Sequence, residues 1–206
     1  MRTIAYIDGF NLYHSLSPRT GLSGYKWLDL RKLCELSLPP KHKLIEINYF
    51  STLAHWDAEK IKRHKHYISA LETKGITFIP GRFQKVRRRC HGSCQEWYKT
   101  HVEKKTDVNM AVHLLEDAVN KQYEKALILT ADSDIVPAVH ALKRVRPELV
   151  IEALIPPNLP AKEIRAAVKK ASQVKEQQLA SSQLDNPVIK DRKELPCPPA
   201  WQEKPK

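Results

Sequence analysis

Short apolar runs alternate along this chain with longer segments in which apolar residues recur every three or four positions. The short runs predict buried strands, and the longer segments predict amphipathic helices. The five predicted strands cover residues 3–7, 44–50, 76–79, 126–130 and 149–154. Strands that alternate with helices are typical of a parallel sheet with helices on both faces. The pattern therefore predicts an α/β fold around a mainly parallel five-stranded sheet.

Helical spacing marks the segments between these strands. Helices are expected from about residue 11, over 27–36, over 57–73, from about 106, after residue 134 and over 161–171. In the helix that begins near residue 106, one apolar stripe follows the spacing i, i+3, i+4, i+7 and i+11 and is expected to face the core. Its members are Val108, Ala111, Val112, Leu115 and Val119.

The composition changes after residue 171. Residues 172–206 are rich in Gln, Ser, Lys and Pro. Such a segment buries too little apolar surface to offset the entropy lost on ordering. We therefore expect one domain at residues 1–171, with a basic insert at about 82–105, followed by a flexible tail at 172–206.

Composition also narrows the class of protein. No apolar run reaches the roughly 18 residues that a membrane-spanning helix needs. The first residues enter a strand pattern at once, without the apolar core of a signal peptide. Four cysteines are too few for a secreted scaffold held by disulfides. We expect a cytoplasmic protein with no membrane partner.

Positive charge is concentrated in the basic insert. The chain has a formal net charge of +12, and residues 82–105 hold eight Lys or Arg against two Glu. This concentration favours a polyanionic partner, most often nucleic acid, although a solvated basic surface has the same composition. The expected phosphate contacts are Arg87, Arg88, Arg89, Lys104 and Lys105.

Aromatic residues lie among these basic residues, namely Phe83, Trp97 and Tyr98. Arginine beside an aromatic face suits single-stranded nucleic acid, because phosphates pair with the guanidinium and bases stack on the ring. The alternative is that these rings pack the insert onto the domain.

Carboxylates follow two of the predicted strands. Asp8 comes after the first strand, and Asp132 and Asp134 come after the fourth. Ligands of open parallel sheets bind beyond the carboxyl ends of the strands, so these acids are expected to meet in one crevice. Asp107, in the first turn of a helix, and Glu103 are candidates for the same place. Each acid has a simpler interpretation as a helix cap or turn residue.

Gathered carboxylates repel each other unless a cation neutralises them, and hard ions such as Mg²⁺ and Mn²⁺ prefer oxygen ligands. Such ions support phosphoryl chemistry, because a bound ion lowers the pKa of an attacking water. Asn11, Thr130 and Ser133 are candidates for supporting this site, or they are turn residues.

Cysteine and histidine residues cluster inside the basic insert. Cys90, Cys94 and His101, with His91 as a further candidate, have the residue types of a structural zinc site. The gap of three residues between the cysteines is looser than a typical zinc pair. Two free thiols or a redox pair are the alternatives.

Three motifs together resemble the NYN domain of the PIN-like nuclease superfamily. They are YIDGFNLY (residues 6–13), EKKTDVNMA (103–111) and LILTADSDIVP (127–137). The resemblance covers roughly residues 1–171 and implies a Rossmann-like three-layer αβα sandwich. It also implies a Mg²⁺ or Mn²⁺ site built from Asp8, Asp107, Asp132 and Asp134 that cleaves RNA. The chain departs from the family at Ala131, where a glycine is common, and keeps the turn only if no positive φ is required there.

The sequence therefore favours a metal-dependent ribonuclease, with RNA held by the basic insert and by the basic helix at about 57–73. One alternative is a regulatory RNA-binding protein that keeps the fold without useful catalysis. Another is an enzyme for small molecules, because certain proteins similar to the NYN family are assigned to the hydroxylation of pyridine compounds. The chain has no GxGxxG fingerprint for a dinucleotide.

Overall fold

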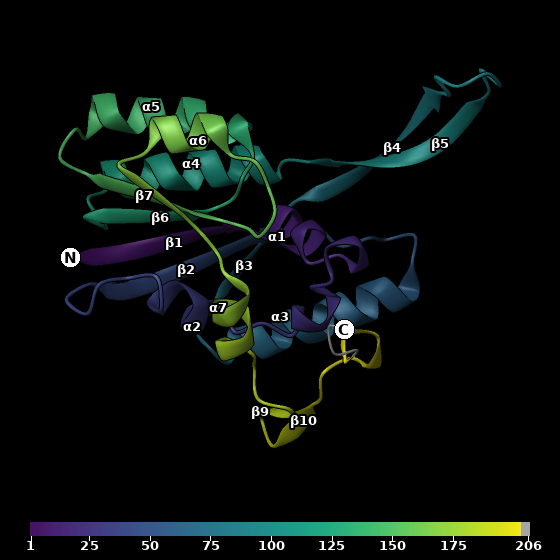
Figure 1. Ribbon diagram of the computed structural model, residues 1–206, viewed down its shortest axis with the longest axis horizontal. Helices are drawn as coiled ribbons and strands as arrows, with labels where there is room; N and C mark the ends of the chain where they lie inside the picture. The colour runs from purple at the N-terminus through teal and green to yellow at the C-terminus, as the bar shows by residue number, and fades with distance from the viewer. Residues whose placement is uncertain (203–206) are drawn as a thin grey trace.

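A six-stranded parallel sheet forms the centre of the computed structural model, which describes residues 1–202 (Figure 1). Its strands are β1 (Arg2–Asp8), β2 (Lys43–Ser51), β3 (Thr77–Pro80), β6 (Lys125–Leu129), β7 (Val150–Ile155) and β8 (Lys170–Gln173). They lie in the order β3-β2-β1-β6-β7-β8, with every neighbouring pair parallel. The predicted α/β fold with a mainly parallel sheet is confirmed.

The sheet has one strand more than predicted. Strand β8 lies at the edge, and three of its four residues are polar, so no apolar run marks it in the sequence. The helix expected over 161–171 ends at Ala167 for the same reason, because the chain turns into this edge strand.

Helices cover both faces of the sheet and give three layers (Figure 1). On one face lie α4 (Thr106–Val119), α5 (Val136–Val145) and α6 (Lys162–Ala167). On the other lie α1 (Gly9–Ser15), α2 (Leu30–Glu35), α3 (Ala58–Glu72) and α7 (Glu176–Ser181). Residues of β1 alternate between the two cores, Ile4 and Tyr6 facing the first group of helices and Ala5 and Ile7 the second. A strand buried on both faces has the continuous apolar run that the sequence shows.

Helix α4 begins where the sequence predicts, but the predicted buried face is only partly correct, since Ala111 and Leu115 pack against the core and the three valines do not. Val108, Val112 and Val119 are exposed. The helix instead buries Met110, Leu114 and Ala118, a second stripe with helical spacing. Polar groups complete this face: Thr106 and Asp117 are buried, and the hydroxyl of Tyr6 donates to Asp117 Oδ2 at 2.7 Å. A search for apolar periodicity alone passes over such positions.

The basic insert forms an antiparallel ribbon of β4 (Arg82–Arg89) and β5 (Trp97–Lys104), which projects from the body of the protein (Figure 1). Its pairing runs from Arg82 opposite Lys104 to Arg89 opposite Trp97. Charged and aromatic side chains thus occupy two exposed strands.

The expectation of a flexible tail from residue 172 is wrong for the part that the structure describes. After β8 and α7 the chain forms a hairpin of β9 (Val188–Lys190) and β10 (Lys193–Leu195), and then the 3-10 turn η4 (Pro199–Trp201). Leu179, Leu184, Val188, Cys197 and Trp201 are buried in the core that contains α1, α2 and α3. A few large apolar residues, well separated in a polar segment, are enough to dock it. The last four residues of the expected tail, 203–206, lie outside the described residues.

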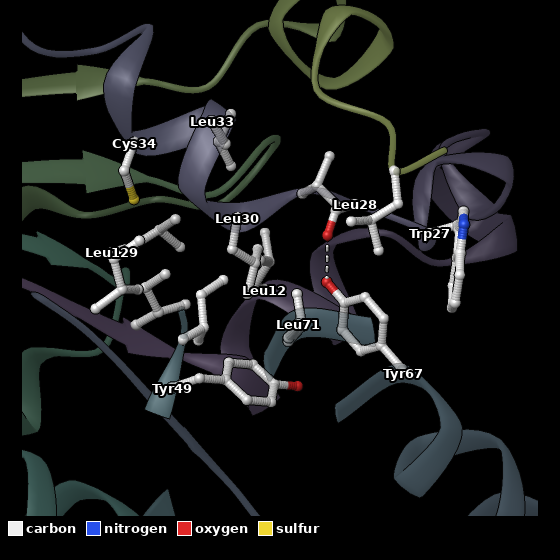
Figure 2. Packing of buried hydrophobic residues seen from close by; sticks show 14 of the residues in the cluster. Leu12, Trp27, Leu28, Leu30, Leu33, Cys34, Tyr49, Tyr67, Leu71 and Leu129 are labelled. Atoms are coloured by element: carbon white, nitrogen blue, oxygen red, sulfur yellow. Dashed lines mark hydrogen bonds between the residues drawn. The ribbon is translucent and has the colours of Figure 1, made fainter. Parts of the chain in front are cut away.

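Side chains from distant segments meet in this core (Figure 2). The hydroxyl of Tyr67 on α3 donates to the carbonyl oxygen of Leu28 at 2.8 Å, and Leu30 and Leu33 of α2 are fully buried nearby. Burying each large apolar side chain contributes about 1.5–3 kcal/mol. Within residues 1–202, no helix has both the length and the apolar character needed to cross a membrane.

Candidate functional site

Three carboxylates meet at the carboxyl end of β6. Asp107 lies in the first turn of α4, and Asp132 and Asp134 lie at the 3-10 turn η3 (Ser133–Ile135) that follows β6. One oxygen from each of these side chains lies within 4.8 Å of the others. The sheet therefore gathers acids that are up to 27 residues apart in the sequence.

Asp8 ends β1, the neighbour of β6, and is nearly completely buried. Its Oδ1 accepts from the backbone amide of Asn11 and its Oδ2 from the hydroxyl of Thr130, both at 2.9 Å. Burial and the negative charges of Asp107 and Asp132 raise the pKa of Asp8, whereas the two hydrogen bonds lower it. The net result is a pKa of about 7. Asp8 thus lies close enough to the three-carboxylate group for the charges of Asp107 and Asp132 to act on it.

Thr130 and Asn11 hold the two strand ends together. The backbone amide of Asp132 donates to the hydroxyl of Thr130, which itself donates to Asp8. The side-chain oxygen of Asn11 accepts from the backbone amide of Ala131 at 3.0 Å. Asn11 and Thr130, two of the supporting residues that the sequence suggested, are therefore hydrogen-bonded to the turn that carries the acids.

The simpler interpretation of these acids as caps is also correct for two of them. Asp8 caps α1 and Asp132 caps η3, where it accepts from the backbone amide of Asp134. Ser133 lies between Asp132 and Asp134 as the first residue of η3. Ala131 has no positive φ, so its departure from the family pattern leaves the turn intact. The cap at Asp132 uses one carboxylate oxygen and leaves the other for a ligand, whereas both oxygens of Asp8 accept hydrogen bonds.

A second polar cluster joins the ribbon to α4. Glu103 Oε1 accepts from the hydroxyls of Thr52, at 3.1 Å, and of Thr106. A Cβ at Gly81 would lie 2.3 Å from both hydroxyl oxygens, so only glycine fits there. Sequence reasoning missed Thr52, Thr106 and Gly81. Thr106 had a signal, because it lies inside the motif between Glu103 and Asp107.

The carboxylates concentrate negative charge at this site. Burial, with the charges of Glu103, Asp132 and Asp134, raises the pKa of Asp107 to about 6. Carboxylates held this close favour protonation unless a cation neutralises them. Three converging oxygen donors suit a hard divalent ion, and a soft ion would need the thiolate or imidazole ligands that this rim lacks among the described residues. The residues therefore fit Mg²⁺ or Mn²⁺.

The ribbon distributes its basic residues over two faces. Neighbouring residues of a strand point to opposite faces, and residues directly opposite each other share one. Arg87, opposite Lys99, and Lys85, opposite His101, therefore lie on one face of the ribbon. Phe83, two residues before Lys85, lies on the same face at the base of the ribbon. Arg89 belongs to the same face, and the guanidinium of Arg87 lies 5.7 Å from the ring centre of Trp97.

Arg88, opposite Tyr98, belongs to the other face. Lys104 ends β5 and Lys105, with a φ of 76°, precedes α4. The suggested phosphate contacts are therefore in two places: the three arginines on the outer part of the ribbon and the two lysines at its base, next to Asp107.

The cysteine and histidine residues do not assemble as a zinc site. Among the described residues, three potential ligands come together only at the aspartate group. His101 stacks flat on Trp56, with ring centres 3.6 Å apart, whereas Cys90 and Cys94 lie at the far end of the ribbon. Both thiols are free, and hydrogen bonds from the backbone of Glu96 and from Cys90 lower the pKa of Cys94. His91 lies in the same exposed turn.

This chain is similar to one known protein in sequence and to another in fold. The chain is 28% identical over 247 aligned residues to 6-hydroxy-3-succinoylpyridine 3-monooxygenase HspA of Pseudomonas putida (strain DSM 28022 / S16), an alignment that covers 100% of this chain and 77% of the relative. A crystal structure of a protein of unknown function from Vibrio parahaemolyticus RIMD 2210633 shares the fold. Its TM-score is 0.57 at 13% identity, over 85% of this chain and 93% of that one.

The family model of the NYN domain matches residues 2–174. The match spans the whole central sheet and every acid described above, and it ends at the edge strand β8. The resemblance seen in the three sequence motifs is thereby confirmed. The chain belongs to the NYN domain family, a family of PIN-like nucleases.

Proposed function

We propose that this protein is a metal-dependent ribonuclease that hydrolyses phosphodiester bonds of single-stranded RNA with Mg²⁺ or Mn²⁺. The observation that carries the proposal is the convergence of Asp107, Asp132 and Asp134 within 4.8 Å at the rim of the sheet. Membership of a PIN-like nuclease family supports it, and so does the basic ribbon beside the rim.

In this mechanism the three aspartates hold the cation. A bound divalent ion lowers the pKa of an attacking water and stabilises the leaving oxygen. Asp8 adds negative charge behind the group and, through Thr130, fixes the turn that presents Asp132. Glu103, held by two threonine hydroxyls, orients the start of α4 and therefore Asp107.

The basic residues bind the RNA backbone in this proposal. Lys104 and Lys105 lie next to Asp107 in the chain and would contact phosphates near the cleaved bond. Arg87, Arg89 and Lys99 share one face of the ribbon and would contact phosphates farther along the strand. Arginine pairs with phosphate through two parallel hydrogen bonds, and this geometry suits a flexible single strand.

Cleavage of a 5′-labelled single-stranded RNA tests this function. Mn²⁺ should support cleavage and EDTA should abolish it. Asp132→Asn should lower the rate by on the order of 100-fold or more, because a lost ligand removes a few kcal/mol of transition-state stabilisation. Asp191→Asn makes the same chemical change in the exposed turn between β9 and β10 and should keep full activity.

Three results contradict the proposal. Cleavage that persists in EDTA would exclude the metal mechanism. Cleavage unchanged in Asp132→Asn would place the chemistry elsewhere. Salt-sensitive RNA binding without cleavage would support the regulatory RNA-binding alternative, because electrostatic contacts to phosphate weaken with salt.

A second candidate function rests on the Pseudomonas putida relative, whose name describes a monooxygenase acting on a pyridine compound. Chemistry on a small heteroaromatic substrate would use the same rim of the sheet. Purified protein incubated with pyridine carboxylates, followed by chromatography for hydroxylated products, tests this candidate. Products that form only with an added electron donor and oxygen would favour it over the nuclease.

A further inference from the structure

A cavity of about 320 Å³ lies beside the acidic rim, among α1, α3, the base of the ribbon and the turn η4. Gly9, which follows Asp8 in the chain, lines it. Thr52, whose hydroxyl donates to Glu103, also lines it. The cavity and the acidic site therefore share a border. Its volume lies within the range of small-molecule sites, about 300–1,000 Å³.

Aromatic rings form two sides of this cavity. On one side Trp56 stacks on His101 and packs edge-on against Phe83, with centres 4.7 Å apart. On the other, Trp201 packs against Tyr67 and Tyr13 at 5.5 and 6.4 Å. Trp56 remains 46% exposed, although a large ring gains free energy from burial. Such rings offer faces on which a flat ligand stacks.

The charged groups of the cavity all have one sign. Lys26, Lys60 and Arg63 line it, and no carboxylate is among the described residues that do so. Lys60 is paired with Asp57 at 3.1 Å, which leaves Lys26 and Arg63 as the cations available to a ligand. Lys26 Nζ lies 4.2 Å from the ring centre of Tyr13, and the Arg63 guanidinium 5.9 Å from that of Trp201.

Two histidines of the cavity, His14 and His64, add hydrogen-bonding groups. Burial lowers the pKa of His64 to about 4 and also lowers the pKa of His14, so both rings are neutral near pH 7. A neutral imidazole has one donor and one acceptor nitrogen. His64 Nε2 lies 3.3 Å from the hydroxyl of Tyr49.

We propose that this cavity binds one flat heteroaromatic ring that carries an anionic group, with the ring against the aromatic walls and the anion at Lys26 and Arg63. This proposal rests on the proposed ribonuclease function, in which the ligand is the base and phosphate of one nucleotide beside the cleaved bond. A free heteroaromatic carboxylate has the same chemistry and is the second source.

The C-terminal segment forms part of the wall of this cavity. Trp201 closes one wall, and it lies beyond residue 174, where the match to the family ends. Its ring is held by Tyr67 on α3 and Tyr13 on α1, so η4 joins two helices that border the cavity. The segment after β8 thus determines the width of the ring site.

Calorimetric titrations of the full chain in EDTA test the proposal without any contribution from catalysis. The probes are uridine 5′-monophosphate, a single-stranded pentanucleotide and pyridine-3-carboxylate. Arg63→Ala and Trp56→Ala should each raise the dissociation constant of the bound probe about tenfold or more, since each removes one of the two interactions. Arg144→Ala on α5, outside both the cavity and the ribbon, is the matched control and should leave binding of every probe unchanged.

The outcomes separate this proposal from the ribonuclease function. Nucleotide binding that the cavity variants weaken supports both, whereas pyridine-3-carboxylate binding alone supports the cavity and argues against the nuclease. Absence of binding by all probes, or binding that Arg63→Ala and Trp56→Ala leave unchanged, overturns the cavity proposal. If RNA cleavage still requires Asp132 in that case, the ribonuclease function stands without the cavity. Unchanged melting temperatures of the variants show that they remain folded.

Discussion

The two sides of the rim, separated by β1, have opposite chemistry. On the side of β6 and α4, the carboxylates of Asp107, Asp132 and Asp134 converge. On the side of β2 and α3, the cavity is aromatic and its charged groups are basic. A site that binds a cation on one side and an anion on the other suits a polyanionic substrate whose phosphate meets the metal. The contrast suits the division that we propose, between chemistry on the acidic side and recognition on the aromatic side.

The largest expected effect comes from Trp201→Ala, which opens a wall of the aromatic side. Removing a buried tryptophan costs about 3–5 kcal/mol, because apolar contacts are lost and a cavity remains. Urea denaturation should show a loss of this size, and mononucleotide binding should fall with it. Trp97→Ala, at an exposed ring, should change stability by less than about 0.5 kcal/mol. An equal effect of the two substitutions would show that the C-terminal segment is not docked as described.

A pair of substitutions should separate the two sides. Asp132→Asn should lower kcat for RNA by on the order of 100-fold while leaving the dissociation constant of a mononucleotide within about twofold. Trp56→Ala should raise KM about tenfold and change kcat little, because stacking acts on the bound and transition states alike. Steady-state kinetics measure kcat and KM of the two variants, and calorimetry measures their dissociation constants. If each variant changed kcat and KM to a similar extent, the division between the two sides would be contradicted.

The acidic side should make stability depend on pH. The pKa of Asp8 is raised to about 7 and that of Asp107 to about 6, so the folded protein keeps protons that the unfolded chain releases near pH 4. In metal-free buffer, stability should therefore be highest below about pH 4 for these groups and fall as pH rises to about 7, by on the order of 1–3 kcal/mol.

Mn²⁺ should reverse this loss, because a bound cation stabilises the charged carboxylates. Denaturation at pH 5.5 and 7.5, with and without Mn²⁺, checks both expectations. Asp8→Asn should flatten the metal-free profile between these values. A profile unaffected by Asp8→Asn would mean that the buried carboxylate does not titrate in this range.

The smallest expected effect concerns the ribbon. Arg87→Ala should weaken binding of a single-stranded RNA severalfold and reduce the slope of log affinity against log salt by about 0.7, as expected for one lost phosphate contact. Arg88→Ala is its matched control on the opposite face of β4 and should have less effect. Fluorescence anisotropy at several salt concentrations measures both. Equal effects would show that the RNA does not follow the face shared with Phe83 and His101.

Most of the acidic side is predictable from the sequence, because Asp8, Asp132 and Asp134 come at or just after the ends of strands that are buried on both faces. Apolar runs locate the ends of β1 and β6, and parallel strands bring those ends to one edge. The amino-acid sequence alone is therefore enough to select Asp8, Asp107, Asp132 and Asp134 as candidates. It does not show that Asp8 is buried behind the other three, held by Asn11 and Thr130.

The aromatic side is not predictable in the same way. Its rings come from α1, α3, the ribbon and η4, and no periodicity links Tyr13, Trp56 and Trp201. The composition after residue 171 predicts a flexible tail, although a few buried residues dock it. The candidate zinc ligands are not gathered in one place, because the ribbon extends Cys90 and Cys94 away from His101, and residue type and spacing do not show this. Such features depend on tertiary packing.

Calorimetric titration of Mn²⁺ into the wild-type protein and Asp132→Asn tests the central claim most directly, that the acidic side holds a divalent cation. The account predicts saturable Mn²⁺ binding near pH 7.5 that weakens by at least tenfold in Asp132→Asn and is retained in Asp191→Asn. Equal Mn²⁺ binding by all three proteins, or none by the wild type, would contradict it.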